Sequence, residues 1–349
     1  MATPQLGWDV GTGYDMFISL GVLHEPDNFG LRGAWAAGVR SRLPTPERET
    51  LQKLVSACSW PLHWVYTLPE PKDGAAVLNG LSKVPAAERL KAFTITHFYS
   101  AETLEMLANV SARGVWDEQD LKQLQTATKD WGKKTTKKRL SQMLNVWSEP
   151  EAFGEAVLRA LRTYHEVFFA EEEQRIGPAL ETAVFHAQEI APKLTLPALL
   201  EELSQGLRFP EEMEMKELVL VPSFWATPLM LFIPLTPEKR MLFFGARPAD
   251  ASLVPGDVVP DALFQALKAM ADPTRLRILR YLSTEPLTPA ELSRRLRLRA
   301  PTVIHHLHAL RLARLVHLEL SEEEGSKKYA ARREAVTVAF HILEDFLDR

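Results

Sequence analysis

Three histidines stand within four positions of the segment TVIHHLHAL, residues 302–310. Imidazole side chains can bind metal ions, transfer protons or contact nucleic acid, so the neighbouring residues have to distinguish these chemistries. On a helix, His305 and His308 lie one turn apart and could in principle share a metal ion. Two ligands do not make a zinc site, and no Asp, Glu or Cys nearby completes one. We therefore expect neither a metal nor a cofactor here.

The helix predicted over residues 300–312 has an inward and an outward face. Val303, Leu307 and Leu310 follow the i, i+4, i+7 spacing of a buried stripe. His306 neighbours this stripe, so we expect it to be a partly buried packing residue. The outward face then carries Thr302, Ile304, His305, His308 and Arg311.

Two short helices are predicted immediately before this segment. Asp272 is a good N-cap for the first, residues 272–283, in which Leu276, Leu279 and Leu282 are expected to face inward. The second, residues 287–298, opens with Thr288, Pro289 and Glu291, which make a capping box with proline at the first helical position. A tight turn then leads to 300–312, which is the helix-turn-helix arrangement.

The remaining C-terminal elements are a hairpin and a helix. Residues 316–331 read as two strands around a glycine-containing tip, a β-wing, and 333–347 as a closing amphipathic helix. An amphipathic helix is also predicted over 261–271.

The strings ALKAMADPTRLRILRYLS (266–283), LTPAELSRRLRL (287–298) and TVIHHLHALRLARLV (302–316), in this order and spacing, resemble the ArsR-type (arsenic-repressor-like) winged-helix transcription regulators. The resemblance covers roughly the last quarter of the chain. It implies a winged-helix fold, a homodimer, and binding of double-stranded DNA in the major groove through the second helix of the motif. DNA-facing surface then becomes the favoured interpretation of His305.

Several residues depart from the pattern of that family. Arg297 and Arg299 stand where the family often has a glycine in the turn and a small polar cap, and both are expected near phosphates. Ile304 replaces a usual polar residue and could contact a thymine methyl group. The predicted wing tip carries Glu322, Glu323 and Glu324, which would repel phosphate, so Lys327 and Lys328 remain as the backbone contacts of the wing.

Metal sensing is common in the resembling family, but its ligands are incomplete here. The helix expected over 289–297 has no cysteine. His341 and Glu344 would supply half of a site on the last helix, while residues 328–330 are Lys-Tyr-Ala instead of an Asp-x-His. We interpret His341 as a residue of a dimer interface and predict no metal.

Charge is distributed unevenly along the chain. The net charge is −4, but residues 275–333 hold 13 Lys or Arg and 6 Asp or Glu. A basic region 275–333 in an otherwise acidic chain is typical of a segment that binds phosphate groups. Solvated helices often show a similar excess of positive charge.

Residues 1–250 are predicted to form a helical domain. Three-to-four spacing predicts helices over 28–43, 45–59, 100–114 and 149–175, the last with a Ser148–Glu151 capping box. Short apolar runs over 216–247 predict an antiparallel β-meander. Residues 251–260 have the composition of a linker, and 261–349 form the winged helix-turn-helix domain.

Other features of 1–250 have a structural and a functional interpretation. Trp60 and Trp64 could line an apolar ligand pocket but are more often core residues. The basic run 132–140 reads as a solvated helix start, with nucleic-acid contact as the alternative. The segment DVGTGYD (9–15) lacks the third glycine of a nucleotide fingerprint. We expect a cytoplasmic protein, because the chain has a single cysteine, Cys58, and no leader pattern. We expect no membrane span, because prolines interrupt the apolar run 218–235.

The sequence thus predicts a mainly α protein with small β elements. Its expected function is a homodimeric DNA-binding transcription regulator, a repressor, with an N-terminal domain that senses a small molecule or a partner. No catalytic residue is expected. The alternatives are an enzyme with its site in 1–250 and the winged helix as a docking module, or an interaction module that has lost DNA binding. A titratable cluster converging in an N-terminal pocket would favour the enzyme.

Overall fold

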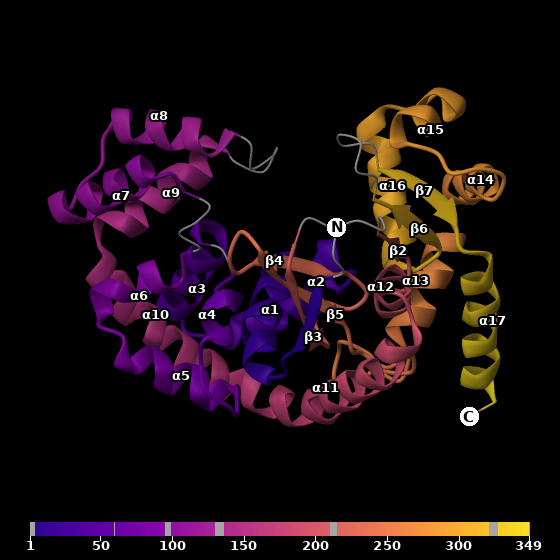
Figure 1. Ribbon diagram of the computed structural model, residues 1–349, viewed down its shortest axis with the longest axis horizontal. Coiled ribbons are helices and arrows are strands. Elements are labelled where there is room, and N and C mark those ends of the chain that lie inside the picture. Colours follow the sequence, from indigo (N-terminus) through magenta and orange to yellow (C-terminus); the bar gives the residue numbers. More distant parts are fainter. Residues whose placement is uncertain are drawn as a thin grey trace.

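The computed structural model describes residues 4–58, 60–94, 99–129, 136–209, 215–320 and 327–348. Within these residues helices predominate and two small sheets complete the fold, which confirms the expected mainly α architecture (Figure 1). The first helical elements are α1 (Thr12–His24), η1 (Pro26–Phe29), α2 (Gly33–Ser41), α3 (Thr45–Ala57), α4 (Leu62–Tyr66), α5 (Gly74–Lys83) and α6 (Ala86–Ala92). They are followed by α7 (Ala101–Arg113), α8 (Glu118–Ala127), α9 (Lys137–Ser148), α10 (Pro150–Tyr164), the π-helical η4 (His165–Phe169), α11 (Ala170–Ile190), η5 (Ala191–Lys193) and α12 (Leu196–Ser204).

The larger sheet has four strands in the order β1-β3-β5-β4. These are β1 (Gln5–Trp8), β3 (Glu217–Ser223), β4 (Leu231–Pro234) and β5 (Lys239–Gly245). β3 pairs in parallel with β1 and with β5, and only β4 is antiparallel to β5. The predicted antiparallel meander is therefore wrong in its pairing, and β1 was not foreseen.

Burial on both faces explains this difference. In β3, Val219 and Val221 join the core beneath α1 and α10, while Leu218 and Leu220 join a second core with α12. A strand covered on both sides reads as a continuous apolar run, which is typical of parallel sheets between helices. The run in β3 has this character, but a single run does not reveal its partner strands.

Helices α7, α8 and α9 form a separate lobe with its own apolar core, which includes Leu107, Leu124 and Leu144. Figure 1 shows this lobe at one end of an arch, with α10 and α11 along the base and the C-terminal helices at the other end. The helix predicted over 149–175 continues through η4 and α11 to Ile190. Its expected cap is wrong, because Glu149 occupies the N-cap of α10 without a side-chain cap.

The helix predicted over 28–43 is also interrupted. Residues 26–29 form η1, and Gly30 follows with φ 73°, a left-handed conformation that ends the helical turn. α2 then begins only at Gly33. This break leaves the segment 27–33, called the loop 27–33 below although it includes the end of η1 and the first residue of α2, beside the C-terminal part of the chain.

The C-terminal region contains α13 (Asp261–Met270), α14 (Pro273–Leu282), α15 (Pro289–Leu296), α16 (Ala300–Leu312), β6 (Val316–Glu319), β7 (Lys328–Ala331) and α17 (Arg333–Leu347). β6 and β7 pair antiparallel, as expected for a wing. A third strand, β2 (Leu207–Arg208), pairs in parallel with β6 and comes from the preceding part of the chain. The wing sheet is thus completed by residues outside the predicted C-terminal domain.

The segment predicted as a linker, 251–260, has specific contacts. Leu253 is buried in the core under the larger sheet, and the Arg175 guanidinium donates to the carbonyls of Ser252 and Leu253 at 3.1 and 3.3 Å. The Asp261 carboxylate accepts the backbone N–H of Leu253 at 2.6 Å. These contacts fix the start of α13 to the first part of the chain, while the domain boundary itself stays a prediction.

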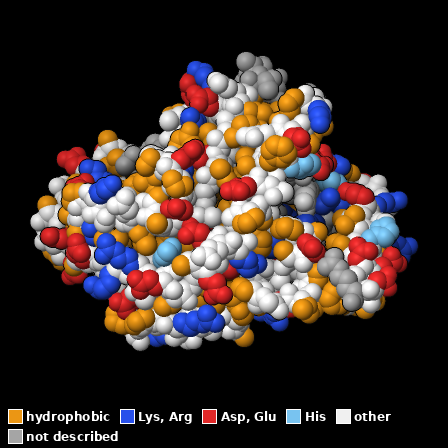
Figure 2. Space-filling model, turned by 90° about the horizontal axis from the view of Figure 1, so that it is seen from below, with side chains coloured by type: hydrophobic (Ala, Val, Ile, Leu, Met, Phe, Trp, Pro, Cys, Tyr) orange, Lys and Arg blue, Asp and Glu red, His pale blue; other side chains and the backbone are white. Residues whose placement is uncertain are grey.

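The lower face of the molecule, seen in Figure 2, carries acidic and basic side chains interspersed with apolar ones. This face offers no continuous basic surface. Among the described residues, no helix combines the length and the apolar character that crossing a membrane requires.

Candidate nucleic-acid interface

The helix-turn-helix unit consists of α14, α15 and α16, and both of its predicted caps are confirmed. The Asp272 carboxylate accepts the backbone N–H groups of Thr274 at 2.8 Å and Arg275 at 3.0 Å. The Thr288 hydroxyl accepts the N–H of Glu291 at 3.2 Å, and the Glu291 carboxylate accepts the N–H of Thr288 at 2.7 Å. These bonds satisfy orphan donors at the two helix starts and thereby fix where α14 and α15 begin.

An apolar core holds the three helices together. Its buried members include Ile278, Leu282, Leu292, Leu296, Val303, Leu307 and Leu310. The predicted inward stripe of α16 is therefore confirmed. The stripe of α14 is partly wrong, because Leu276 is 49% exposed and Ile278 is buried in its place.

The turn between α15 and α16 is built from two arginines. Arg297 ends α15 in the left-handed conformation, with φ 57° and ψ 40°, where glycine is the residue without a steric penalty. Arg299 is the N-cap of α16 and makes no side-chain capping bond. Both side chains are exposed. Arg297 is strained and Arg299 leaves the start of α16 uncapped, but together they place two cations at the N-terminal end of this helix.

The outward face of α16 is narrower than predicted. Thr302, Ile304 and His305 are exposed, whereas His308 and Arg311 are only partly so. Burial lowers the pKa of the Arg311 guanidinium, and the neighbouring Tyr329 hydroxyl partly offsets this effect. The first turns of α16 therefore present the accessible side chains.

His306 lies beside the inward stripe and is partly buried. Burial lowers its pKa, and the charges of Arg275 and His305 act in the same direction against the opposing carboxylate of Asp272. A neutral imidazole in this place fits the packing role that the sequence predicted.

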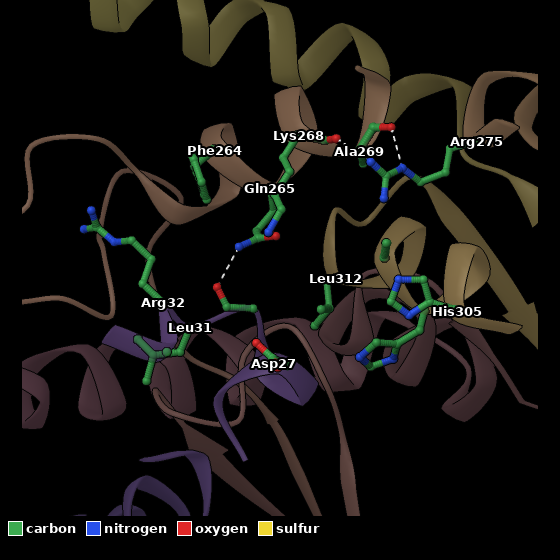
Figure 3. Close-up of a pocket in the computed structure, with 14 residues that line it drawn as sticks. Asp27, Leu31, Arg32, Phe264, Gln265, Lys268, Ala269, Arg275, His305 and Leu312 are labelled. Atoms are coloured by element: carbon green, nitrogen blue, oxygen red, sulfur yellow. Dashed lines mark hydrogen bonds between the residues drawn. The ribbon is translucent and has the colours of Figure 1, made fainter. Parts of the chain in front are cut away.

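A cavity of about 330 Å³ opens against the second half of the outward face. His305, His308, Ala309 and Leu312 of α16 line it together with residues of α13 and of the loop 27–33. Figure 3 shows His305 and Leu312 on one side of this space, Gln265 and Lys268 on another, and Asp27 and Leu31 opposite. No local sequence pattern marks this cavity, because residues some 275 positions apart form it.

The wing contributes exposed cations, as expected. Lys327 and Lys328 at the start of β7 are both exposed. Glu322, Glu323 and Glu324, the predicted acidic tip, lie outside the described residues, as does the beginning of the basic run 132–140.

The half metal site on the last helix remains a pair of exposed side chains, His341 and Glu344. Among the described residues, no group of three or more His, Cys, Asp or Glu side chains could hold a metal ion.

The tryptophans proposed for a ligand pocket pack in the N-terminal core. The Trp64 ring is 9% exposed and meets Phe93 edge to face, with ring centroids 5.7 Å apart. Trp60 lies so close to Gly21 that a Cβ atom there would be 2.1 Å from its ring. The core interpretation accounts for both residues, and a ligand role stays a prediction.

A polar cluster does lie beside an N-terminal cavity of about 550 Å³ that Glu70, Lys72 and Glu181 help to line. Its groups are bonded to each other: the Lys72 ammonium pairs with the Asp9 carboxylate and donates to the Tyr66 carbonyl at 2.9 Å, and the Tyr14 hydroxyl donates to Asp9 at 2.9 Å. Burial and the Asp9 charge raise the pKa of Tyr14 far above its usual range. These contacts account for the groups as a structural cluster, and the enzyme alternative stays a prediction.

A second buried network joins the sheet to the helices. The fully buried Asp15 carboxylate accepts the Ser223 hydroxyl at 2.6 Å and the backbone N–H groups of Phe224 and Trp225 at 2.9 and 3.2 Å. Burial raises the pKa of Asp15 to about 6 against the lowering effect of these bonds. No local sequence pattern predicts the role of this carboxylate, which closes the end of β3.

Comparison with known protein families matches residues 272–317 to the bacterial regulatory protein, arsR family. The match begins at the N-cap of α14 and ends within β6, so it covers the whole helix-turn-helix unit. No curated protein and no solved structure gave a significant match to the chain. The C-terminal region therefore contains an ArsR-type helix-turn-helix domain, and this domain supports a DNA-binding transcription regulator.

Proposed function

We propose that the protein is a homodimeric repressor that reads operator DNA with α16 and whose first 250 residues sense a small molecule or a partner. One observation carries the proposal: the accessible face of α16 begins at two exposed arginines, within the segment that matches the arsR family. The proposal assigns no catalytic role to the chain and places it in the cytoplasm, where an operator is accessible.

The proposed contacts divide by chemistry. Arg297 and Arg299 bind phosphates, since a guanidinium donates in pairs to phosphate oxygens. Thr302, Ile304 and His305 face base edges, and the apolar Ile304 suits a thymine methyl group. His308 and Arg311, which are partly buried, are proposed to contact DNA from the later turns of α16. Lys327 and Lys328 of the wing are proposed to contact the neighbouring phosphate backbone.

The exposed apolar side chains of α13 and α17 support a dimer. They are Phe264 and Leu267 on α13, and Val338, Phe340 and Leu347 on α17. α13 and α17 contact each other, so these residues belong to one part of the molecule. Clustered apolar side chains in water are typical of an interface. A two-fold dimer formed there would present two copies of α16 to half-sites about 34–36 Å apart.

The proposal is tested by fluorescence anisotropy of the full-length protein with DNA from upstream of its own gene. Random DNA is the control, and the salt concentration is varied. We expect binding at least about 1,000-fold tighter to the upstream DNA, together with a steep salt dependence. Equal, weak binding to both DNAs would contradict the proposal.

The double variant Arg299→Ala with His305→Ala tests the assigned residues. We expect it to lose discrimination between the two DNAs while its thermal unfolding remains cooperative. Arg162→Ala, an exposed arginine on α10, is the matched control and should bind DNA like the wild type. Unchanged discrimination in the double variant would contradict the site assignment and leave the domain assignment intact.

A further inference from the structure

Two cavities meet where the loop 27–33 faces the C-terminal helices. The outer one is the cavity of about 330 Å³ beside α16, and the inner one measures about 10 Å³, close to the minimum that holds one water molecule. Gly30, Gln265 and Leu312 line both, so these residues form the wall between them. The Gln265 amide donates to the Gly30 carbonyl at 2.7 Å, a single hydrogen bond that Figure 3 shows crossing this space.

Two guanidinium groups line the inner cavity with incomplete partners. Arg247 is 8% exposed, and its Nη2 donates to the Thr227 carbonyl at 2.7 Å. Its Nη1 is buried without a hydrogen bond and lies 3.6 Å from the Asp261 carboxylate. The Arg314 side chain forms no hydrogen bond or ion pair with any described residue.

The electrostatics of the inner cavity favour an added negative charge. Burial lowers the pKa of Arg247 and of Arg314 to about 10, and the Arg247 charge contributes to the effect on Arg314. Among the described residues, Asp261 supplies the one carboxylate that lines this cavity, and it already accepts the N–H of Leu253 at 2.6 Å. One engaged carboxylate does not compensate two desolvated cations.

The outer cavity supplies space for a larger, mostly apolar body. Leu31, Phe264 and Leu312 give it apolar walls, and the cation of Lys268 stands against the carboxylate of Asp27. The two arginines that line the outer cavity already have partners. Arg32 pairs with Asp257, and Arg275 donates to the carbonyls of Ala269 and Lys268 at 2.9 and 2.7 Å.

We propose that this junction binds a small organic oxyanion, a carboxylate or phosphate group attached to a ring-sized apolar body. Its charged end meets Arg314 and Arg247 once Gln265 turns away from Gly30, and its apolar body fills the outer cavity. The role of this ligand as an effector rests on the proposed function. His305 and Leu312 of α16 line the same cavity, so an occupant fixes the loop 27–33 beside the DNA-reading helix and weakens DNA binding.

Isothermal titration calorimetry of the full-length protein tests the site with three probes. They are phenyl phosphate, inorganic phosphate, and phenol as the neutral match of the first. We expect saturable one-to-one binding of phenyl phosphate, weaker binding of inorganic phosphate, and none of phenol. Absence of saturable binding of both phosphates up to about 10 mM would overturn the site.

Two variants locate the binding. Arg314→Gln removes a cation that has no described partner, so it should weaken phenyl phosphate binding at least about 10-fold without lowering the melting temperature. Gly33→Leu fills the outer cavity, because a Cβ at Gly33 meets nothing within 4 Å, and should abolish binding. Gly38→Leu, at an equally open position of α2 outside the cavity lining, and Arg162→Gln are the matched controls and should bind normally. Wild-type affinity in both Arg314→Gln and Gly33→Leu would overturn the assignment.

DNA binding separates this inference from the proposed function. Saturating phenyl phosphate should raise the Kd for the upstream DNA between about 5- and 150-fold in the wild type and leave it unchanged in Gly33→Leu. Ligand binding without any specific DNA binding would support the site and contradict the proposed function. Specific DNA binding that phenyl phosphate leaves unchanged would overturn the effector role.

Discussion

The two parts of the molecule use their charged residues differently. In the first 250 residues, several buried charges are bonded internally, as in Asp15 with Ser223 and in Lys72 with Asp9. In the helix-turn-helix unit, several exposed arginines form no side-chain hydrogen bond or ion pair with any described residue: Arg277, Arg280, Arg294, Arg297 and Arg299. Charges of the first kind hold elements together, whereas charges of the second kind remain available to an external polyanion.

The largest effect should come from removing an internally bonded charge. Asp15→Ala leaves a hydroxyl and two backbone N–H groups without their acceptor in a fully buried place. We expect the free energy of unfolding to fall by about 3 kcal/mol in urea denaturation, since each buried unsatisfied donor costs about 1–3 kcal/mol. Glu166→Ala, at an exposed position of η4, is the control and should change stability by less than about 0.5 kcal/mol. Equal effects of the two substitutions would contradict the conclusion that the internally bonded charge of Asp15 holds elements together.

What the sequence predicted well depends on neighbours along the chain. The caps at Asp272 and Thr288 use partners two or three positions away, and the buried stripe of α16 repeats within ten residues. The resemblance to the ArsR-type regulators also predicted that the turn of the helix-turn-helix motif lies at Arg297. These features need no knowledge of the rest of the fold.

What the sequence did not predict depends on distant pairing. β1 pairs with β3 more than 200 positions away, and β2 completes the wing sheet from outside the predicted domain. The cavity beside His305 likewise requires the loop 27–33 to meet α13 and α16. The sequence of an apolar run or of a loop does not indicate which distant segment it contacts, so these contacts appear only in the structure.

Among the exposed arginines without a described partner, Arg299 should lower stability while it favours DNA binding. Arg299→Ser supplies the missing N-cap of α16, so we expect the free energy of unfolding to rise by about 1 kcal/mol. The same substitution removes a proposed phosphate contact, so the slope of log K against log salt should fall by about 1. Arg299→Lys keeps the charge without adding a cap and should alter neither quantity greatly. A salt slope that Arg299→Ser leaves unchanged would show that this arginine does not face phosphate.

Arg297 offers a second, smaller test of the same conflict between stability and DNA binding. Arg297→Gly removes the steric penalty of a side chain at φ 57°, and we expect a gain in unfolding free energy of up to about 1 kcal/mol together with weaker DNA binding. Arg294→Gly, in the last turn of α15, is the matched control, because glycine inside a helix costs about 1 kcal/mol. Opposite signs for the two substitutions in thermal unfolding would support the argument, and a loss of stability in both would contradict it.

The smallest effect should be a dependence of stability on pH within the DNA-binding region. Burial, Arg275 and His305 lower the pKa of His306 in the folded protein, and Asp272 raises it. Because the folded pKa lies below the unfolded value of about 6.5, the unfolded chain binds more protons as pH falls below that value. His306 therefore contributes to a loss of stability as pH falls below about 6.5 and contributes no pH dependence well above that value.

His306→Gln removes this contribution and should make the loss on acidification smaller, as measured by urea denaturation at pH 7.5 and pH 5.5. Some loss should remain, since burial also lowers the pKa of His24 and His317. His341→Gln, at an exposed position of α17, should leave the pH dependence as in the wild type. If His306→Gln instead increased the loss, the imidazole would be stabilised as a cation by Asp272, and α16 would carry one more positive charge than its packing indicates.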